Sequence, residues 1–506
     1  MELTIGALWF SIGLFLITAV LAKVVNMRNT IDYVSTLAPP PEVKGISLLG
    51  LFPTLFTKGP EATMQYLYNK LGSAFTVSFL WKRTTFLVGQ EASGVFFQGL
   101  ESEVTQGNLF EFTVPMFGTE MGFAVDYATR MEQTRFFVDS LRPAQLRSYV
   151  DPMVQEVENY FAKWGEQGVV DLKYEFEELL MLISSRCLVG KEVREKMFGE
   201  FCTLFHEIEE GVNFASFMFP YIPIPVNRRR DRARIRLKGI ISEVVRSRKI
   251  FNSVEDDVLQ RFIDSTYKGG RGTTVEEVSG MMLGLIFAGK HTSAMTTTWT
   301  GACLLSHAKY FDAALEEQKQ IIRKYNGNID YNILSEMVTL HSCIKEAARM
   351  HPALPTLVRQ VKKDSTVRTK EGHEYVIPRG DTLVNLVMVN NRLAHIYKDP
   401  MVYDPDRFRP GREEDKAGGK FSYTSFGGGR HACGGEAYAY MQIKIIFSHL
   451  LRNFEMELIS SFPKPDWSKF LPEPKGKVMV SYKRSGCRAS TSTSPGLKLR
   501  RGVQRR

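Results

Sequence analysis

The ten residues from Phe426 to Gly435, FGGGRHACGG, place Cys433 in a loop of which half is glycine. A cysteine thiolate is a nucleophile and a metal ligand, and glycines let the backbone approach a large, flat group closely. The loop lacks the Lys-Ser/Thr ending of a phosphate-binding loop. No C-x-x-C spacing of a zinc site occurs in the chain. The loop therefore predicts that Cys433 binds a partner other than a nucleoside phosphate or zinc.

Two other patterns carry chemical groups on predicted helices. Glu346 and Arg349 are three residues apart, so they share one helix face. The run from Ala288 to Ser293, AGKHTS, sits in a long apolar stretch, where the Thr292 hydroxyl can bond a backbone carbonyl or donate to a ligand. Each pattern alone also fits an ordinary helix, either as an ion pair or as a close crossing of small residues.

Together, the spacing Phe426-x-x-Gly429-x-x-x-Cys433-x-Gly435 and the two helical patterns resemble the cytochrome P-450 family, and the resemblance covers about residues 40–484. It implies that family's fold, mainly α with a minor β region, in a single catalytic domain behind an N-terminal membrane helix. It also implies haem b as cofactor, with Cys433 as the axial ligand of the iron, and O2 as co-substrate of a monooxygenase.

The resemblance also implies roles for other residues. Arg407, in YDPDRF, would join Glu346 and Arg349 in a structural lock beneath the haem. Gly289 would leave room for oxygen, and Thr292 with His291 would relay protons, because the usual pKa of a histidine lies near neutrality. The haem contacts implied are Phe426, Gly429, Gly435, His431, Arg359 and Tyr127. The substrate pocket implied is Phe110, Phe112, Ala288, Leu354 and Thr356.

His291 stands where most members of the family have a carboxylate, and this variant is similar to the sterol 14α-demethylases. The runs FTVPMFG, FPYIPIP, RRRDRAR, YDPDRF and FSYTSFGGGRHAC resemble the plant members, which act on obtusifoliol. The expected substrate is therefore a sterol. The expected electron donor is an NADPH-dependent flavin reductase, since the chain has no recognisable flavin or nicotinamide site.

Departures from the plant pattern leave two alternatives open. Phe110 replaces a tyrosine, Lys290 a glutamine, and Gly434 a leucine or isoleucine, and the run after His351 is altered. One alternative is a divergent plant triterpenoid hydroxylase or epoxidase. The other is a haem-binding or sterol-binding protein without catalytic activity.

The N-terminus predicts a membrane anchor over residues 1–30. Leu3 to Ala22 holds twenty residues without a charge, about 30 Å of helix. Lys23 and Arg28 follow it, which predicts a cytosolic catalytic domain on the endoplasmic reticulum membrane, attached by a single span. A cleaved signal peptide is the competing interpretation. After the anchor we expect a proline-rich connector (31–45), the monooxygenase domain (46–484) and a basic disordered tail (485–506).

Several elements of the domain can be anticipated. Residues 74–88 predict a β-hairpin, a capping box at Thr274 predicts a helix that runs to about residue 308, and short strands are expected around 374–389. The apolar segment Phe214–Val226 is either core or a loop that dips into the lipid bilayer, with Arg228–Arg230 contacting phosphates.

Charge and cysteine usage exclude other classes. The net charge is +10, but the tail carries six basic residues and no acid, which leaves +4 for the rest. No basic groove interleaved with aromatics occurs, so a nucleic-acid partner is not expected. The six cysteines are scattered, mostly in apolar helical runs, which argues against a disulfide framework and favours a cytosolic body.

Overall fold

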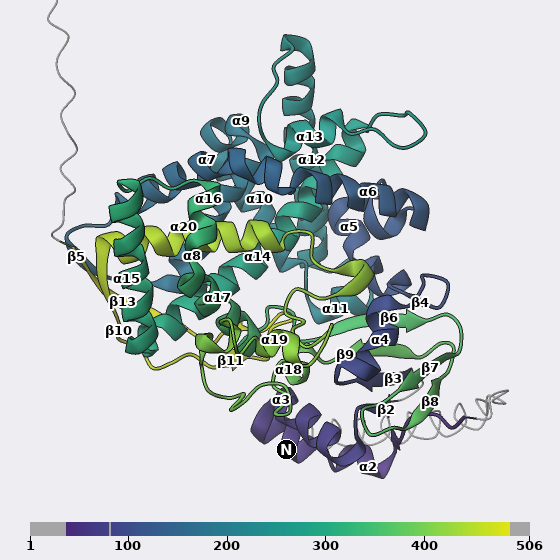
Figure 1. The fold of residues 1–506 in the computed structure, drawn as a ribbon. Helices are drawn as coiled ribbons and strands as arrows, with labels where there is room; N and C mark the ends of the chain where they lie inside the picture. Colours follow the sequence, from purple (N-terminus) through teal and green to yellow (C-terminus); the bar gives the residue numbers. More distant parts are fainter. Residues whose placement is uncertain (1–36, 80–81, 486–506) are drawn as a thin grey trace, which may run out of the picture.

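The computed structural model describes residues 37–79 and 82–485, and the predicted anchor and nearly all of the predicted tail lie outside them. Helices gather around the long α14 and around α20, while the largest sheet lies to one side (Figure 1). The helices are α2 (Ile46–Leu49), α3 (Phe52–Leu71), α4 (Gln90–Gln98), α5 (Val114–Phe117), α6 (Tyr127–Ser140), α7 (Pro143–Phe161), α8 (Leu172–Ser184), α9 (Lys191–Lys196), α10 (Phe198–Glu210), α11 (Phe214–Met218), α12 (Pro225–Phe251), α13 (Val258–Asp264), α14 (Val275–Ser306), α15 (Ala308–Tyr325), α16 (Tyr331–Glu336), α17 (Val338–Met350), α18 (Val387–Asn390), α19 (Glu414–Ala417) and α20 (Glu436–Asn453). Shorter helical turns are η1 (Gly107–Thr113), η2 (Gly122–Ala124), η3 (Ser185–Val189), η4 (Pro405–Phe408) and η5 (Gly429–His431).

The strands form one six-stranded sheet and three smaller ones. They are β1 (Glu42–Val43), β2 (Ala74–Phe79), β3 (Lys82–Leu87), β4 (Val104–Thr105), β5 (Gln167–Asp171), β6 (Leu357–Val361), β7 (Ser365–Arg368), β8 (Glu374–Ile377), β9 (Thr382–Asn385), β10 (Phe454–Leu458), β11 (Pro465–Asp466), β12 (Glu473–Pro474) and β13 (Met479–Arg484). The large sheet has the order β1-β2-β3-β9-β6-β4. The predicted hairpin is confirmed, because β2 and β3 pair antiparallel.

Two boundaries differ from expectation. Residues 42–43, inside the predicted connector, form β1 and pair in parallel with β2, so the chain already joins the sheet there. The predicted strand region 374–389 holds β8 and β9, but it ends in α18, whose residues are helical. The reason is local: the amides of residues 389–391 bond to carbonyls three and four residues back instead of to a neighbouring strand.

Helix α14 starts with the predicted capping box. The Thr274 hydroxyl accepts a hydrogen bond from the Glu277 N–H (3.2 Å), and the Glu277 carboxylate accepts one from the Thr274 N–H (2.8 Å). These two bonds satisfy amides that a helix start leaves unpaired. The helix is tied to α20 by Gln442, whose amide nitrogen lies 2.5 Å from the Ser293 hydroxyl.

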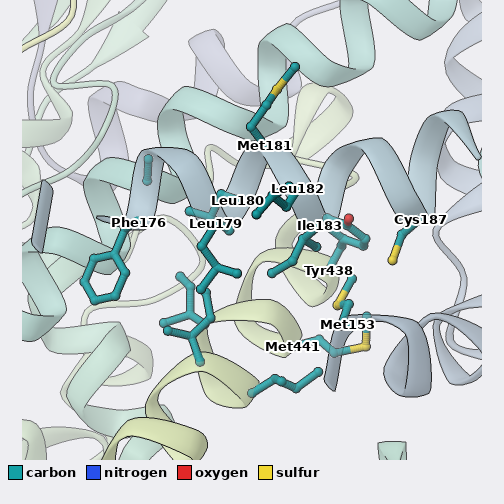
Figure 2. Close-up of a cluster of buried hydrophobic side chains, with 14 of the residues drawn as sticks. Met153, Phe176, Leu179, Leu180, Met181, Leu182, Ile183, Cys187, Tyr438 and Met441 are labelled. Carbon is teal, nitrogen blue, oxygen red and sulfur yellow. The ribbon is translucent and has the colours of Figure 1, made fainter. Parts of the chain in front are cut away.

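The main core lies where α8 crosses α7 and α20. Figure 2 shows the side chains of α8, among them Phe176, Leu179 and Ile183, beside Met153 of α7 and Met441 of α20. All five are at most 2% exposed. Burial of each such side chain contributes roughly 1.5–3 kcal/mol relative to exposure, so this cluster holds α20, and with it the cysteine loop that precedes α20, against the helical core.

A buried ion-pair network joins α17 to the loops that follow the sheet. The Glu346 carboxylate accepts hydrogen bonds from Arg349 (2.7 and 2.9 Å), from Arg407 (2.9 Å) and from the Asp404 N–H (3.0 Å). Arg407 also pairs with Glu414. Glu346, Arg349 and Arg407 are 0% exposed. The two buried guanidinium groups are thus each hydrogen-bonded to a carboxylate, as burial of a charge requires.

The segment Phe214–Val226 is surface, not core. It begins with the short helix α11 and ends at Pro225, which starts α12, and its Phe214 and Phe219 are 75% and 62% exposed. The expectation that Arg228–Arg230 all reach outward is wrong for Arg230. That side chain is 1% exposed, because it folds back to bond Asp231 and the Pro220 carbonyl.

Within residues 37–79 and 82–485, no helix combines the length and apolarity that a membrane span needs.

The first prediction concerns the ion-pair network. Glu346→Ala would leave two buried arginines without their shared carboxylate. Breaking a buried pair costs about 3–5 kcal/mol, a large part of a domain's stability. We expect little folded protein, measured as soluble yield and denaturant midpoint. Glu336→Ala is the matched control, because Glu336 pairs with Lys324 at the surface and exposed pairs contribute little. A Glu346→Ala protein with the wild-type midpoint would contradict this assignment.

The second prediction concerns acid. His351 stacks on Trp299 at 3.8 Å, and neither of its buried ring nitrogens has a hydrogen-bond partner among the described residues. Burial, with Arg349 adding to it, lowers the pKa of His351 from the usual 6.5 to about 3. Between pH 6.5 and pH 3 the unfolded chain therefore binds a proton at His351 that the folded chain does not bind. The contribution of neutral His351 to the free energy of unfolding is full above pH 6.5 and is lost as pH falls toward 3.

We therefore expect His351→Phe, which keeps a stacked ring but cannot titrate, to lose less unfolding free energy than the wild type between pH 7 and pH 5. Denaturant titrations at both pH values measure this difference. His206→Phe, at an exposed histidine, should keep the wild-type slope. Equal slopes in wild type and His351→Phe would show that His351 is not held neutral.

Candidate functional site

Cys433 lies three residues before Glu436, the first residue of α20. The residue is exposed, and its own N–H donates to the Phe426 carbonyl (2.9 Å), which closes the loop on itself. Desolvation by neighbouring protein atoms raises the pKa of the Cys433 thiol, and hydrogen bonds from the N–H groups of Gly435 and Glu436 oppose this rise only in part. Unpaired amides at the start of a helix favour a negative charge. The arrangement thus presents an accessible sulfur with backbone donors that suit a thiolate.

The loop needs glycine at position 429. Gly429 has φ +63°, and a Cβ there would lie 2.0 Å from the Phe97 carbonyl oxygen at the end of α4. No side chain fits such a distance, and the left-handed backbone favours glycine independently. The next residue, Arg430, donates to the Gln98 carbonyl (3.2 Å). The cysteine loop therefore rests directly on the last residues of α4.

Arg359 and His431 lie in one cationic cluster beside this loop. Arg359 is 5% exposed, it lies over the Phe96 ring at 4.8 Å, and no described acidic side chain forms an ion pair with it. Burial lowers the pKa of Arg359 to about 10. Burial and then the Arg359 charge lower the pKa of His431 to about 4. The cluster therefore has a surplus of positive charge and of donors, which suits a bound carboxylate.

Arg130 and Glu101 belong to the same cluster, and sequence reasoning missed both. Arg130 pairs with Glu101 at 3.3 Å, and both charges act on His431. Arg130 also lies over the Tyr127 ring at 5.4 Å, so it connects the predicted Tyr127 with the cluster. No motif marks Arg130 in the sequence. The one sequence signal for Arg130 is its position four residues after Asp126, the residue that caps α6.

The middle of α14 is accessible, although the turns on either side of it are buried. Ala288 is exposed, and Gly289, His291 and Thr292 are half-buried. A Cβ added at Gly289 would meet no atom within 4 Å. The Thr292 hydroxyl donates to the Ala288 carbonyl at 2.7 Å. This part of the helix thus offers open space next to a hydroxyl.

His291 and Lys290 differ in their partners. The His291 Nε2 atom is buried and has no hydrogen-bond partner among the described residues. Burial lowers the pKa of His291, against the attraction of Glu209 and Glu473. Lys290 by contrast forms an ion pair of 2.8 Å with Glu209 of α10.

The predicted pocket residues come from three places, one of which is Ala288 of α14. Phe110 in η1 stacks on Phe123 (ring centroids 4.7 Å apart), while Phe112 contacts Phe217 of α11 and Phe470. The other two, Leu354 and Thr356, precede β6, and Leu354 is 38% exposed. The structure thus brings together the cysteine loop, Arg359 and His431, and it places η1 in contact with β6.

The residues present fit a haem. An accessible sulfur with backbone donors, a buried arginine that lacks an acidic partner, and a helix with open space at Gly289 match the iron ligand, the propionates and the oxygen side. Cys433 would hold the iron, and Arg359 and His431 would hold the propionates. When bound, the haem supplies the oxidation chemistry that no side chain of this cluster can perform.

The comparisons agree with this geometry. The family model for cytochrome P-450 matches residues 39–480. The chain is 53% identical to the obtusifoliol 14-alpha demethylase of Sorghum bicolor, over 88% of this chain and 90% of that one. It is 50% identical to the sterol 14-demethylase of Arabidopsis thaliana, over 92% and 96% of the two chains. It is 33% identical to the lanosterol 14-alpha demethylase of Mus musculus, over 88% of each.

A solved structure has the same fold. It is the retinoic acid-bound cyanobacterial CYP120A1, with a TM-score of 0.76 and 20% identity, which covers 89% of this chain and all of that one. The mainly α fold with a minor β region is therefore confirmed. With the match to the family model over most of the chain and with a cysteine loop, an ion-pair network and a central helix arranged for haem, this chain belongs to the cytochrome P-450 family.

Proposed function

We propose that this monooxygenase removes the 14α-methyl group of a sterol of the obtusifoliol type. The observation that carries the proposal is an identity of 53% and 52%, over 88% of the chain, to the sorghum and wheat proteins named obtusifoliol 14-alpha demethylase. Three successive oxidations would release the methyl carbon as formate, with O2 as co-substrate at each step.

The chain's own residues would orient and protonate. Cys433 would hold the iron, and Gly289 would leave space for oxygen. Thr292, whose hydroxyl bonds the Ala288 carbonyl, can hold a proton next to that space. His291 directly precedes Thr292 and has an unpartnered ring nitrogen, so it can transfer a proton to Thr292.

The haem propionates would be held by the cationic cluster. Arg359 and His431 supply donors, with Arg130 nearby and Tyr127 under the Arg130 guanidinium. Phe426, Gly429 and Gly435 would shape the loop around the iron ligand. The substrate would meet Ala288, whose accessible side lies next to Gly289, together with a set of loop residues: Phe110, Phe112, Leu354 and Thr356.

Electrons would come from an NADPH-dependent flavin reductase, since a cytochrome P-450 of this type needs a redox partner and the chain shows no nucleotide-binding motif. We further propose that the enzyme works at the endoplasmic reticulum membrane, with the catalytic domain in the cytosol. The exposed apolar side chains of Phe214, Phe219 and Tyr221 support this, because they form a patch next to the exposed Arg228. The anchor predicted over residues 1–30 would be the second attachment.

A cyclic triterpene is the second candidate substrate, and one observation favours it. Phe110, which lacks the hydroxyl of the related tyrosine, lies flat on Phe123, with ring planes 17° apart. Arg130 covers the Phe123 ring at 4.8 Å. This stack makes the edge of the pocket more apolar than a tyrosine would. A haem-binding or sterol-binding protein without catalysis is the alternative of another class, motivated by Lys290 and Gly434.

The third prediction tests the iron ligand. In Cys433→Ser the thiolate is lost, so the Soret band of the reduced carbonyl complex should move away from the position that thiolate ligation produces. Cys202→Ser is the matched control: it makes the same change at a half-buried thiol of α10 and should leave the spectrum unchanged. A Cys433→Ser protein that retains the thiolate spectrum would show that another residue binds the iron.

The fourth prediction tests the substrate. Purified enzyme, with a plant reductase and NADPH, should convert obtusifoliol to the 14-demethylated product with NADPH consumption coupled to product. A cyclic triterpene should give neither a Soret shift nor product. Absence of detectable demethylation would contradict the proposal, product from the triterpene alone would establish the second candidate, and NADPH use without any product would favour the non-catalytic alternative.

Phe110→Tyr refines this test. A hydroxyl buried without a partner costs about 1–3 kcal/mol, whereas a paired one is nearly neutral. If the cationic cluster accepts the new hydroxyl, turnover of the sterol should hold or rise; a tenfold loss of sterol turnover, about 1.4 kcal/mol, would mean that it does not. Phe79→Tyr is the control, since it makes the same change on an exposed ring of β2.

A further inference from the structure

A set of charged side chains surrounds the accessible middle of α14. On α14 itself, Lys290 binds Glu209 at 2.8 Å, and both side chains are mostly buried, with 14% and 17% exposed. Glu209 stands in the last turn of α10, which ends at residue 210. The pair therefore joins two helices that are 81 residues apart in sequence. A lysine this deep in the protein needs a counter-ion, and Glu209 supplies it.

Two buried polar atoms next to this pair have no partner among the described residues. One is the Glu209 Oε1 atom, and the other is the His291 Nε2 atom. Glu209 is the foremost of the charged groups that act on His291. A carboxylate that is free to approach an imidazole ordinarily binds it, because the carboxylate stabilises the protonated ring. Here the carboxylate is bound to Lys290 instead.

The other charges that face His291 come from α8 and β12. Lys173, at the start of α8, pairs with Glu473 of β12 at 2.8 Å. Glu177, also on α8, lies among the same groups, and burial raises the pKa of its carboxyl. Burial is the largest cause that lowers the pKa of His291, while Glu209 and Glu473 favour the protonated ring and Lys290 and Lys173 oppose it. Of these charged groups, Glu209 and Lys290 are bound to each other.

The pair of Lys290 and Glu209 lies next to a surface histidine. His206, which is 70% exposed, has its Nδ1 atom 4.0 Å from Glu209. Glu209 is thus placed between a solvent-exposed imidazole on one side and the residues of α14 on the other. The Glu209 carboxylate can bind His291 of α14 only when it is not bound to Lys290.

We propose that Lys290 is a positioning residue, which holds the Glu209 carboxylate in an ion pair and thereby keeps it from the bare ring nitrogen of His291 beside Thr292. This inference deepens the proposed monooxygenase function, on which it rests, since it assigns to Lys290 the control of the proton donor at the oxygen side. His291 with one bare ring nitrogen can accept a proton and pass it on. His291 bound to Glu209 would instead stay charged and fixed.

Substitution of Lys290 follows directly from this geometry. Lys290→Gln removes the positive charge and frees Glu209, so the Glu209 carboxylate can bind the His291 ring. The pKa of His291 should then rise, because a close opposite charge favours the protonated ring. Lys290→Arg keeps the charge and the ion pair, and should leave the pKa of His291 as in the wild type.

The experiment is a histidine titration by NMR on the reduced carbonyl holoenzyme, which is diamagnetic. The chain has nine histidines, so ring 13C labelling gives few signals, and the signal missing from His291→Asn identifies His291. In the wild type this signal should titrate below 6.5, the usual value. In Lys290→Gln it should titrate at higher pH than in the wild type, and in Glu209→Gln/Lys290→Gln most of that rise should disappear.

Either of two results would overturn the proposal: an unchanged His291 pKa in Lys290→Gln, or a rise that persists in the double variant. Lys173→Gln is the matched control, because it removes a lysine from the same surroundings but leaves the Glu209 pair intact, so its effect should be smaller. If Lys290→Gln does not fold, Lys290→Met replaces it, with the same expectation. The titration needs no turnover, so a failure of the proposed substrate would leave its outcome standing.

Discussion

The position of the cysteine loop depends on two buried arginines that share one glutamate. Arg349 and Arg407 are fully buried, and Glu346 binds both. The remaining donors of Arg349 reach the Asn391 carbonyl at 2.7 Å. Buried cations require such saturation, since an unpaired one costs several kcal/mol. The network therefore fixes the relative position of α17 and of the segment around residue 391.

That segment in turn holds the start of the cysteine loop. The Asn391 side chain accepts from the Thr424 N–H (3.2 Å) and donates to the Ser425 hydroxyl (2.8 Å). The Ser425 hydroxyl donates to the Ala348 carbonyl, one residue before Arg349. The ion pairs thus extend through side-chain bonds to the residue that precedes Phe426. On the other side α20, packed in the core of Figure 2, fixes the loop's end. A thiolate held from both sides is preorganised for a metal.

The middle of α14 follows a different rule. Over most of its length the helix is buried among apolar neighbours, whereas residues 288–292 combine open space with a lysine, a histidine and a hydroxyl. Charges at such depth are stable only in pairs, and the chain supplies Glu209 for Lys290 and Glu473 for Lys173. The middle of α14 is therefore organised by which carboxylate binds which cation. The cysteine loop is organised by backbone geometry instead.

Motifs with a local physical cause could be predicted from the sequence alone. The capping box at Thr274 uses atoms three residues apart, the β2–β3 hairpin joins neighbouring strands, and the spacing around Cys433 follows from one loop and one helix start. The lock between Glu346 and Arg349 also lies within one helical turn. Because these contacts are short in sequence, the residue types themselves specify them.

Contacts between distant segments were decided only by the tertiary structure. Arg130 meets Glu101 across 29 residues, and Lys290 meets Glu209 across 81 residues. Arg230 turns inward because the Pro220 carbonyl is within reach. Residues 387–390 form a helix although their apolar run predicts a strand. In each case the partner is chosen by how helices and loops pack, and a pattern of neighbouring residues does not record that packing.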